Sequence, residues 1–345
     1  MIDWASVLFP LTHTPIYSGE VVSIDSDGVE EWRSAKRIAL AGTFEKKVSI
    51  RSSGGNGSGL ATHLYFNGNP SKFLQGHNVF GSDDIVSLLS DCYFQIVKRY
   101  NLTPSNMDIM RVKTGDYPIK RVDINYSFTL PTQADVQAWL RGAEFKAKTR
   151  QGRPSNKSGS IYFGATSEYY KIVLYSKLLE IQTKRGALPL QLQDRGIEDW
   201  VSNVLRCEVR LLSKELKRLN ITSVNQLTPP IVNYLFQEYI GRLDMTDQIQ
   251  LSDDVLLSMP KKLRSTYTLW SEGHDLRDMM SNATYHRHRN DLKAYGINID
   301  LRPESIKKTN VVPLVRVLEA KPAQIPEWAF DQGLVHYSAL NAMVY

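Results

Sequence analysis

A tyrosine and a lysine stand two residues apart at Tyr175 and Lys177, in the string VLYSKLLE at residues 173–180. A tyrosine oxygen can attack the phosphorus of a DNA phosphodiester, and a neighbouring ammonium group can favour the phenolate or add positive charge at the phosphate. Ionising a phenol of pKa near 10 at pH 7 costs about 4 kcal/mol, so such a tyrosine needs help from its surroundings. The alternative is an ordinary core tyrosine with a solvated lysine beside it, and the pair alone does not decide.

Two carboxylates lie on the polar faces of strands that are otherwise apolar. Residues 120–130 alternate, so that Asp123 shares the polar face of a predicted strand. Residues 205–211 (LRCEVRL) alternate in the same way, with Glu208 flanked by Arg206 and Arg210. Asp123 could serve a site or simply face solvent. Glu208 could belong to a structural ladder of salt bridges or be a metal-binding carboxylate held in place by its arginines.

Basic side chains gather in two segments that suit the DNA backbone. The segment KAKTRQGRPSNK at residues 146–157 enters the Tyr175 hairpin and contributes Lys146, Lys148, Arg150, Arg153 and Lys157. Its alternative is a solvated loop. The second segment, residues 284–295, is the last of three short predicted helices (261–272, 275–281, 284–295) that resemble a helix-turn-helix, and it contributes Arg287, Arg289 and Lys293.

His286 and His288 also lie in this last helix, but they do not predict a metal site. Residues at i and i+2 on a helix point about 200° apart, so the two rings cannot share one ion. His288 falls in line with Tyr285, Leu292 and Tyr295 and is expected to be half-buried packing.

The elements that must position Tyr175, Asp123 and Glu208 predict an α+β fold. Residues 160–164 and 169–175 form a β-hairpin, and a helix begins at residue 176, so Tyr175 falls at a strand-to-helix junction. Further strands are expected at 4–9, 19–24, 46–51 and 60–67, an irregular segment at 70–81, and helices at 83–100, 133–145, 197–204 and 231–243. The expected domains are a sheet domain at 1–224 and a mainly helical region at 225–345.

Composition fits a soluble globular protein with a mild basic bias. The chain has 345 residues, 42% of them hydrophobic, and 42 Lys and Arg against 36 Asp and Glu. The apolar N-terminus lacks a basic segment and a cleavage site, and no apolar run approaches the roughly 18 residues that span a bilayer. Cys92 and Cys207 are expected to be buried thiols in a reducing compartment, so a cytosolic protein is predicted. The Gly-rich string SSGGNGSG lacks the ending of a P-loop, so no nucleotide cofactor is expected.

Five strings, taken together and in order, resemble a known family. KFLQGHNVFG (72–81), RVDINYSF (121–128), VLYSKLLE (173–180), RCEVRL (206–211) and NVVPLVR (310–316) are similar to the gene II replication initiators of filamentous bacteriophages and their II/X relatives. The resemblance covers nearly the whole chain. The Tyr-x-Lys hairpin and the Arg-x-Asp strand also resemble parts of plasmid rolling-circle Rep proteins.

The resemblance implies an HUH/Rep-like antiparallel sheet nuclease followed by a helical DNA-binding region. Such a protein nicks the plus strand at a phage origin, keeps the 5′ end as a phosphotyrosine while the 3′ hydroxyl primes synthesis, and later rejoins the strand into a circle. Tyr175 matches the nucleophile. The implied partners are double-stranded origin DNA, single-stranded phage DNA, and a host helicase and polymerase in the bacterial cytoplasm, with possible oligomers on the origin.

The metal site is the least direct of the expectations. Asp123, Glu208 and His77 of QGHN are assigned to it from residue type at matching positions. The chain has no His-hydrophobic-His triplet, so a site with more carboxylate is expected, which suits Mg²⁺ or Mn²⁺. The competing hypothesis is a non-catalytic regulator that binds DNA through residues 285–295.

Overall fold

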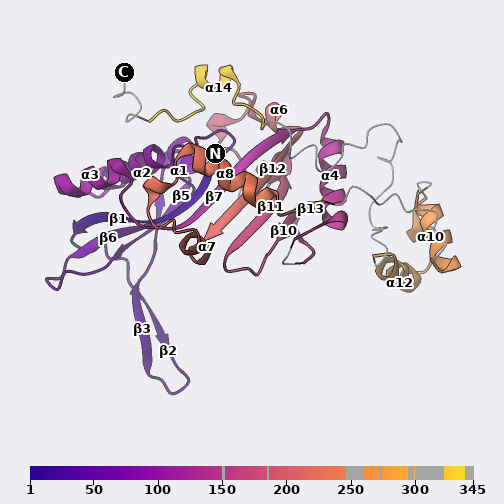
Figure 1. Cartoon of the computed structure of the whole chain (residues 1–345), viewed down its shortest axis with the longest axis horizontal. Helices are drawn as coiled ribbons and strands as arrows, with labels where there is room; N and C mark the ends of the chain where they lie inside the picture. Colours follow the sequence, from indigo (N-terminus) through magenta and orange to yellow (C-terminus); the bar gives the residue numbers. More distant parts are fainter. Residues whose placement is uncertain are drawn as a thin grey trace.

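A nine-stranded antiparallel sheet organises the chain between residues 2 and 212 (Figure 1). The computed structural model describes residues 1–149, 152–184, 186–245, 259–271, 274–293, 299 and 322–338. The strand order is β4-β5-β6-β1-β7-β12-β11-β10-β9. The strands are β1 (Ile2–His13), β4 (Ile38–Ala41), β5 (Lys47–Ser53), β6 (Ala61–Gly68), β7 (Ile119–Thr129), β9 (Ser155–Lys157), β10 (Ser160–Phe163), β11 (Tyr170–Ser176) and β12 (Val204–Leu212). The predicted α+β fold is confirmed.

Alternation along the central strands gives the sheet one apolar and one polar face. Val122, Ile124 and Phe128 of β7 are buried on the apolar face, and Asp123 and Asn125 point to the other side. The register carries this division from strand to strand, because directly opposed residues share a face. Three rows therefore cross the polar face from β7 through β12 to β11: Asp123, Arg210 and Lys171; Asn125, Glu208 and Val173; Ser127, Arg206 and Tyr175.

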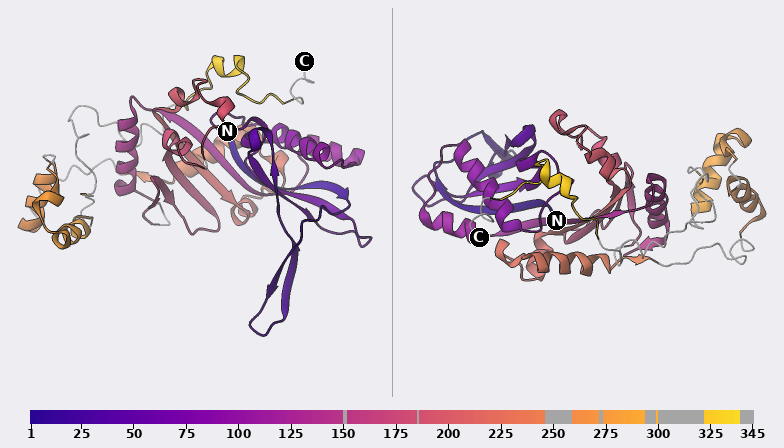
Figure 2. Two further views of the ribbon diagram at one scale, coloured as in Figure 1. Left: turned by 180° about the vertical axis from the view of Figure 1, so that it is seen from behind. Right: turned by 90° about the horizontal axis from the view of Figure 1, so that it is seen from above.

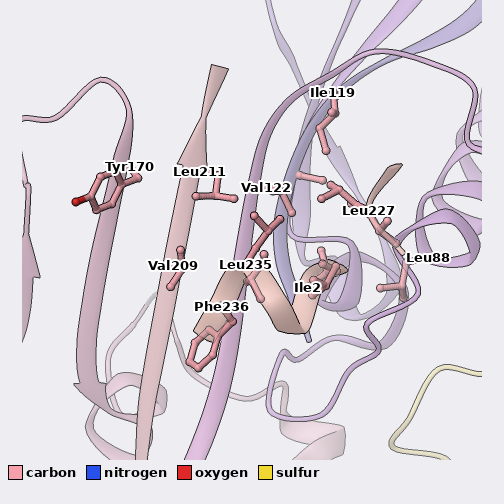
Figure 3. Close-up of a cluster of buried hydrophobic side chains, with 14 of the residues drawn as sticks. Ile2, Leu88, Ile119, Val122, Tyr170, Val209, Leu211, Leu227, Leu235 and Phe236 are labelled. Carbon is pink, nitrogen blue, oxygen red and sulfur yellow. The ribbon is translucent and has the colours of Figure 1, made fainter. Parts of the chain in front are cut away.

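Helices pack on the apolar face and complete the main core. The helices that supply core residues include α2 (Ile85–Arg99), α4 (Gln133–Lys146) and α8 (Pro229–Ile240). Phe236 of α8 lies with its ring centre 4.6 Å from that of Tyr126 on β7, and Leu235 points into the same cluster (Figure 3). Burying each large apolar side chain contributes about 1.5–3 kcal/mol. Helix α8 is therefore an integral part of the sheet domain although it lies beyond residue 224.

A second hydrophobic cluster forms where β11 and β12 meet the following helices. It joins Val79 and Phe80 to α5 (Lys177–Ile181), α6 (Ile197–Val201) and α14 (Glu327–Asp331). The ring of Trp328 on α14 contacts Phe80 edge to face, so a C-terminal segment returns to the sheet domain. Figure 2 shows α14 lying over this region.

Three helices of the C-terminal region pack around their own small core. They are α10 (Lys261–Ser271), α11 (Leu276–Met279) and α12 (Asn282–Lys293), and Leu263, Leu276, Tyr285 and Leu292 are buried between them. The three predicted helices and the helical C-terminal region are thus confirmed. His288 is half-buried with its Nδ1 2.8 Å from the Thr266 hydroxyl, which is the packing role expected for it.

A two-stranded hairpin projects from the sheet domain, formed by β2 (Glu20–Ile24) and β3 (Glu30–Ala35) (Figures 1 and 2). Its side chains include five carboxylates and a single arginine, Arg33, which pairs with Glu20 and Glu30. Such an acidic arm does not suit the DNA backbone.

Several local expectations were wrong or incomplete. Residues 70–81 begin with a helix, α1 (Pro70–Gln75), because Asn69 caps its first turn, Pro70 occupies the first helical position and Gly76 ends it with φ 84°. The helix at 197–204 ends at Val201, since Val204 already belongs to β12. The strand predicted at 19–24 is present as β2, and it pairs in the projecting hairpin. Elements that the sequence pattern does not predict include β3, β4, α3 (Asn106–Thr114), α7 (Ser213–Arg218) and the short pair β8 (Ala147–Lys148) and β13 (Asp244–Met245).

Candidate active site

Tyr175 is the next-to-last residue of β11, and its side chain lies on the polar face opposite Arg206. Ser176 caps α5 by accepting a hydrogen bond from the Leu179 amide, so the predicted strand-to-helix junction is present. Tyr175 is 8% exposed, and its hydroxyl has no hydrogen-bond partner among the described residues. The oxygen is therefore held at the edge of solvent without being committed to a structural contact.

Burial raises the pKa of Tyr175 well above its ordinary value, and the nearby carboxylates of Glu208 and Asp3 raise it further. Arg206 acts in the opposite direction and lowers this pKa. The phenol is therefore fully protonated near neutral pH. Any reaction at its oxygen needs a proton acceptor together with a change in the charges around it.

Lys177 is fully buried at the start of α5, with its ammonium group in a polar network. Nζ donates to the Asn78 side-chain oxygen at 2.8 Å and to Glu180 at 2.6 Å. Burial lowers the pKa of Lys177 to about 8. Although burial opposes ionisation of Glu180, Lys177 and Lys72 hold the pKa of this carboxyl at about 2. The lysine is thus engaged in holding the loop at residue 78.

Asp123 and Glu208 lie one row apart on adjacent strands, and both contact Arg210. Arg210 Nε lies 2.6 Å from Glu208 and 3.6 Å from Asp123, and Arg121 Nε donates to Asp123 at 2.7 Å. Burial raises the pKa of Asp123, and it raises the pKa of Glu208 to about 8 against the opposing charge of Arg210. These two acids form the centre of the polar face, and Glu208 is diagonal to Tyr175 across the β11–β12 pair.

Four further residues, Asp3, Asn69, Asn78 and Arg206, complete this network. Asp3 Oδ1 accepts hydrogen bonds from the side chains of Asn69 at 3.1 Å and Asn78 at 2.6 Å. Asp3 is the extra residue of a β-bulge between Ile2 and Trp4, and the bulge re-aims its side chain. Arg206 is fully buried and donates to the carbonyl oxygens of Asn78 and Val79 at 3.1 and 3.0 Å. The string QGHN was the available signal for Asn78, whereas nothing in the sequence pattern pointed to Asp3.

Asn125 is fully buried on the polar face, directly opposite Glu208. Both polar atoms of its side chain lack a partner in the part of the chain that the structure describes. An unpaired buried amide costs about 1–3 kcal/mol, so this position is a local weakness in the network, as is the unpaired Nε of Arg206.

His77 does not share a site with the two carboxylates. Its Nε2 donates to the Leu334 carbonyl at 2.8 Å, and its Nδ1 accepts from the Val79 amide at 3.2 Å. Burial lowers the pKa of His77 to about 4, so the ring is neutral and both nitrogens are occupied. Among the described residues, no group of three or more His, Cys, Asp or Glu gathers closely enough to hold a metal ion. Metal binding by these residues stays a prediction.

The predicted DNA-binding residues lie on two separate parts of the structure. Arg153 and Lys157 are exposed near β9, and Arg287 is exposed on α12. Arg289 is half-buried on the same helix. Lys146, Lys148 and Lys293 belong to α4, β8 and α12, whereas Arg150 and the string NVVPLVR at 310–316 lie outside the described residues.

A polar sheet face with a tyrosine at a strand-to-helix junction and helices on the opposite face is the architecture of a Rep-like nuclease domain. The chain belongs to the family of gene II replication-associated proteins of phages. Residues 1–229 match the family described as the N-terminal part of this replication-associated protein, and residues 251–335 match the family described as its C-terminal part. The resemblance inferred from the five strings is thereby confirmed.

Individual relatives agree with this assignment. The gene II replication-associated protein of Enterobacteria phage I2-2 is 43% identical over 328 residues, covering 94% of this chain and 95% of that protein. The proteins of the same name from Enterobacteria phages M13 and fd are 26% identical over 170 residues, covering 44% of this chain and 40% of theirs. Within the described ranges, none of the helices has the length and apolar character that a membrane crossing requires.

Proposed function

We propose that this protein initiates rolling-circle replication of a phage genome in the cytoplasm of the bacterial host. It nicks the plus strand at the origin through Tyr175, remains joined to the 5′ end, and later joins the strand ends into a circle. One observation carries the proposal: Tyr175 lies on the same polar sheet face as Glu208 and Asp123, with its hydroxyl free of hydrogen bonds to described residues. Membership in the family of phage replication-associated proteins supports the link to replication.

The nick is a transesterification at phosphorus. The Tyr175 oxygen forms a new bond to the phosphorus, the bond from phosphorus to the 3′ oxygen breaks, and the 3′ oxygen leaves with a proton as a hydroxyl. One phosphodiester replaces another, so the step is nearly isoenergetic and needs no nucleotide. Rejoining is the reverse reaction, in which a 3′ hydroxyl attacks the phosphotyrosine.

Glu208 is the residue best placed to take the phenol proton. It lies diagonal to Tyr175, where long side chains can meet across a strand pair. Its pKa of about 8 is near the working pH, so the ionised fraction of Glu208 can accept the proton and the resulting acid can return it. Arg206, directly opposite Tyr175, favours the phenolate electrostatically.

A divalent ion, Mg²⁺ or Mn²⁺, is part of the proposal, and the structure allows its predicted ligands to be compared. Asp123 suits such an ion, because Mg²⁺ is commonly bound by one or two carboxylates together with substrate phosphates. Glu208 would either hold the ion or accept the phenol proton, since an ion on its oxygens keeps them from taking that proton. His77 does not suit it, because neither ring nitrogen has a free lone pair. When bound with DNA, the ion would neutralise charge on the scissile phosphate.

The proposed partners follow from this reaction. Double-stranded origin DNA and the displaced single strand are the substrates, and Arg153, Lys157 and the α12 arginines are the proposed contacts to phosphates. A host helicase opens the duplex and a host polymerase extends the 3′ end. The three-helix unit α10–α12 could also bind DNA without any chemistry, as a regulator would, and the test must separate these two functions.

The decisive experiment incubates the purified protein with supercoiled phage DNA and Mg²⁺, denatures the mixture and searches for protein joined to a 5′ end. The expected result is a covalent adduct that is absent for Tyr175→Phe, with origin binding retained. An adduct that persists in this variant would move the nucleophile to another tyrosine. Binding without a nick under any divalent ion would leave only the regulator.

A further inference from the structure

Two aromatic rings on the β6–β1 part of the polar face lie against arginine side chains. The guanidinium carbons of Arg37 and Arg51 lie 5.3 and 5.4 Å from the ring centre of Tyr65 on β6. Further along the sheet, the guanidinium of Arg121 lies 5.3 Å from the ring of Trp4 on β1. Each contact is a cation–π pair, which fixes a planar cation beside a planar ring.

A third ring repeats the arrangement toward the opposite edge. Arg210 and Lys157 place their cationic groups 5.8 and 6.0 Å from the ring centre of Tyr162 on β10. The register assigns all three rings to the face of Tyr175. Tyr65 is opposite Leu8, which lies on the same face of β1 as Trp4. Trp4 is opposite Asp123, and Tyr162 is opposite Val173. The three rings therefore lie on strands that span the sheet from β6 to β10.

The rings and their cations remain accessible. Tyr65, Trp4 and Tyr162 are half-buried, and the side chains of Arg121 and Arg210 are 29% and 26% exposed. The apolar face is covered by helices, and the Tyr175 end of the polar face is covered by the 77–80 loop with α5, α6 and α14. A long ligand can therefore lie along the row of Arg121 and Arg210, whose side chains reach solvent.

The charges on this face favour a polyanion. Arg37, Arg51, Lys157 and Lys171 have no carboxylate partner among the described residues, although Arg51 also donates to Ser34 and Lys171 to the Ala165 carbonyl. The only acids in the β7–β12–β11 rows, Asp123 and Glu208, are already paired with arginines. Asp3, whose carboxylate accepts hydrogen bonds from Asn69 and Asn78, adds one negative charge against these four cations, so the uncompensated charge is positive.

We propose that Tyr65, Trp4 and Tyr162, with their stacked cations, form a track that binds single-stranded DNA across the polar face. Unpaired bases stack on aromatic rings and guanidinium planes, and the cations contact the phosphates between them. A duplex keeps its bases stacked inside, so it cannot use these rings. The track passes through the row of Arg210 and Asp123 and so brings a strand to within two rows of Tyr175. The choice of DNA as the strand rests on the proposed function.

The test measures binding of a fluorescein-labelled 20-nucleotide single strand of mixed sequence to the full chain by fluorescence anisotropy. Tyr65→Leu and Tyr162→Leu remove a ring and keep an apolar side chain, so each is expected to weaken binding at least about fivefold. Tyr65→Phe and Tyr162→Phe keep the ring and should bind as the wild type does. Tyr234→Leu is the matched control, because Tyr234 is 62% exposed on α8, away from this face.

A 20-base-pair duplex and an RNA strand of the same sequence complete the design. Duplex binding is expected to be unchanged by the leucine variants. The track would be overturned if both leucine variants bound single-stranded DNA with wild-type affinity. It would also be overturned if the phenylalanine variants lost as much affinity as the leucine variants, or if the leucine variants lost as much affinity for the duplex as for the single strand. Tighter binding of RNA than of DNA would overturn the choice of ligand. Because no nicking is measured, a failure to form the Tyr175 adduct would leave this result intact.

Discussion

Tyr175 and Arg206 are directly opposed on β11 and β12, and both side chains lie on the polar face of the sheet. Arg206, and not the nearby Lys177, is therefore the cation that faces the candidate nucleophile. The same guanidinium donates to the carbonyls of Asn78 and Val79 and so fixes the loop that also binds Lys177. Arg206 thus both fixes the loop at residues 78 and 79 and supplies the positive charge beside Tyr175.

Replacing Arg206 should lower both the stability of the fold and the rate of nicking. Arg206→Met is expected to lower the free energy of unfolding by about 2–4 kcal/mol, because two buried carbonyls lose their donors. Urea denaturation at pH 7 measures the change. The exposed Arg153→Met is the control and should shift stability by less than about 0.5 kcal/mol. A variant of Arg206 as stable as this control would contradict the structural role.

The central sheet was predictable because its strands alternate strictly. In β7 and β12, one apolar side must be buried and the other then faces away, so Asp123 and Glu208 were placed on the polar side from sequence alone. Elements with weaker periodicity were not found. Helix α1 is short and begins at a proline, and β3 lies in a projecting arm that is largely exposed, which removes the burial pattern that marks a strand.

The network around Tyr175 was predictable only in part, because contacts between distant segments are not local patterns. Asp3, placed by a β-bulge, meets Asn78, which lies 75 residues further along the chain. His77 looked like a metal ligand from its residue type, but its partner is a carbonyl 257 residues further along the chain. A conspicuous string such as QGHN marks a structurally demanding position without revealing what it contacts.

Glu208 should make stability fall as the pH rises. Its pKa is about 8 in the folded protein against an ordinary value of 4.5, so the folded state holds the proton more tightly between these pH values. Stability is then lost progressively as the pH rises from about 4.5 to 8. Glu208→Gln resembles the protonated acid and should lack this loss. The two proteins are expected to be similarly stable near pH 4.5. By pH 8 the free energy of unfolding of the variant should exceed that of the wild type by on the order of 1–3 kcal/mol. Thermal or urea unfolding at a series of pH values measures the stability difference between the two proteins. If their stabilities changed in parallel with pH, the raised pKa would not belong to Glu208.

His77 should act as an anchor for the C-terminal segment. His77→Phe removes the hydrogen bond to Leu334, so limited proteolysis should cut residues 322–338 faster than in the wild type. The Mg²⁺ concentration that half-activates nicking should stay unchanged, because both ring nitrogens are already occupied in the folded protein. Tyr337→Phe, at an exposed position of the same segment, is the control for proteolysis. A large increase in the Mg²⁺ requirement would return His77 to the metal site.

The role of Lys177 can be separated into structure and chemistry by a pair of variants. Its ammonium group is buried between Asn78 and Glu180, so Lys177→Met should lower stability by about 2–4 kcal/mol, because Glu180 then keeps only the contact with Lys72. Adding Glu180→Gln removes the unpaired charge and should recover part of this loss, as a double-mutant cycle in urea would measure.

Nicking is then compared at a temperature where all variants are folded. If Lys177 acts on the reacting phosphate or phenol, the double variant stays inactive although its stability has returned. Recovery of nicking together with stability would limit Lys177 to holding the loop, and the positive charge needed at Tyr175 would then come from Arg206.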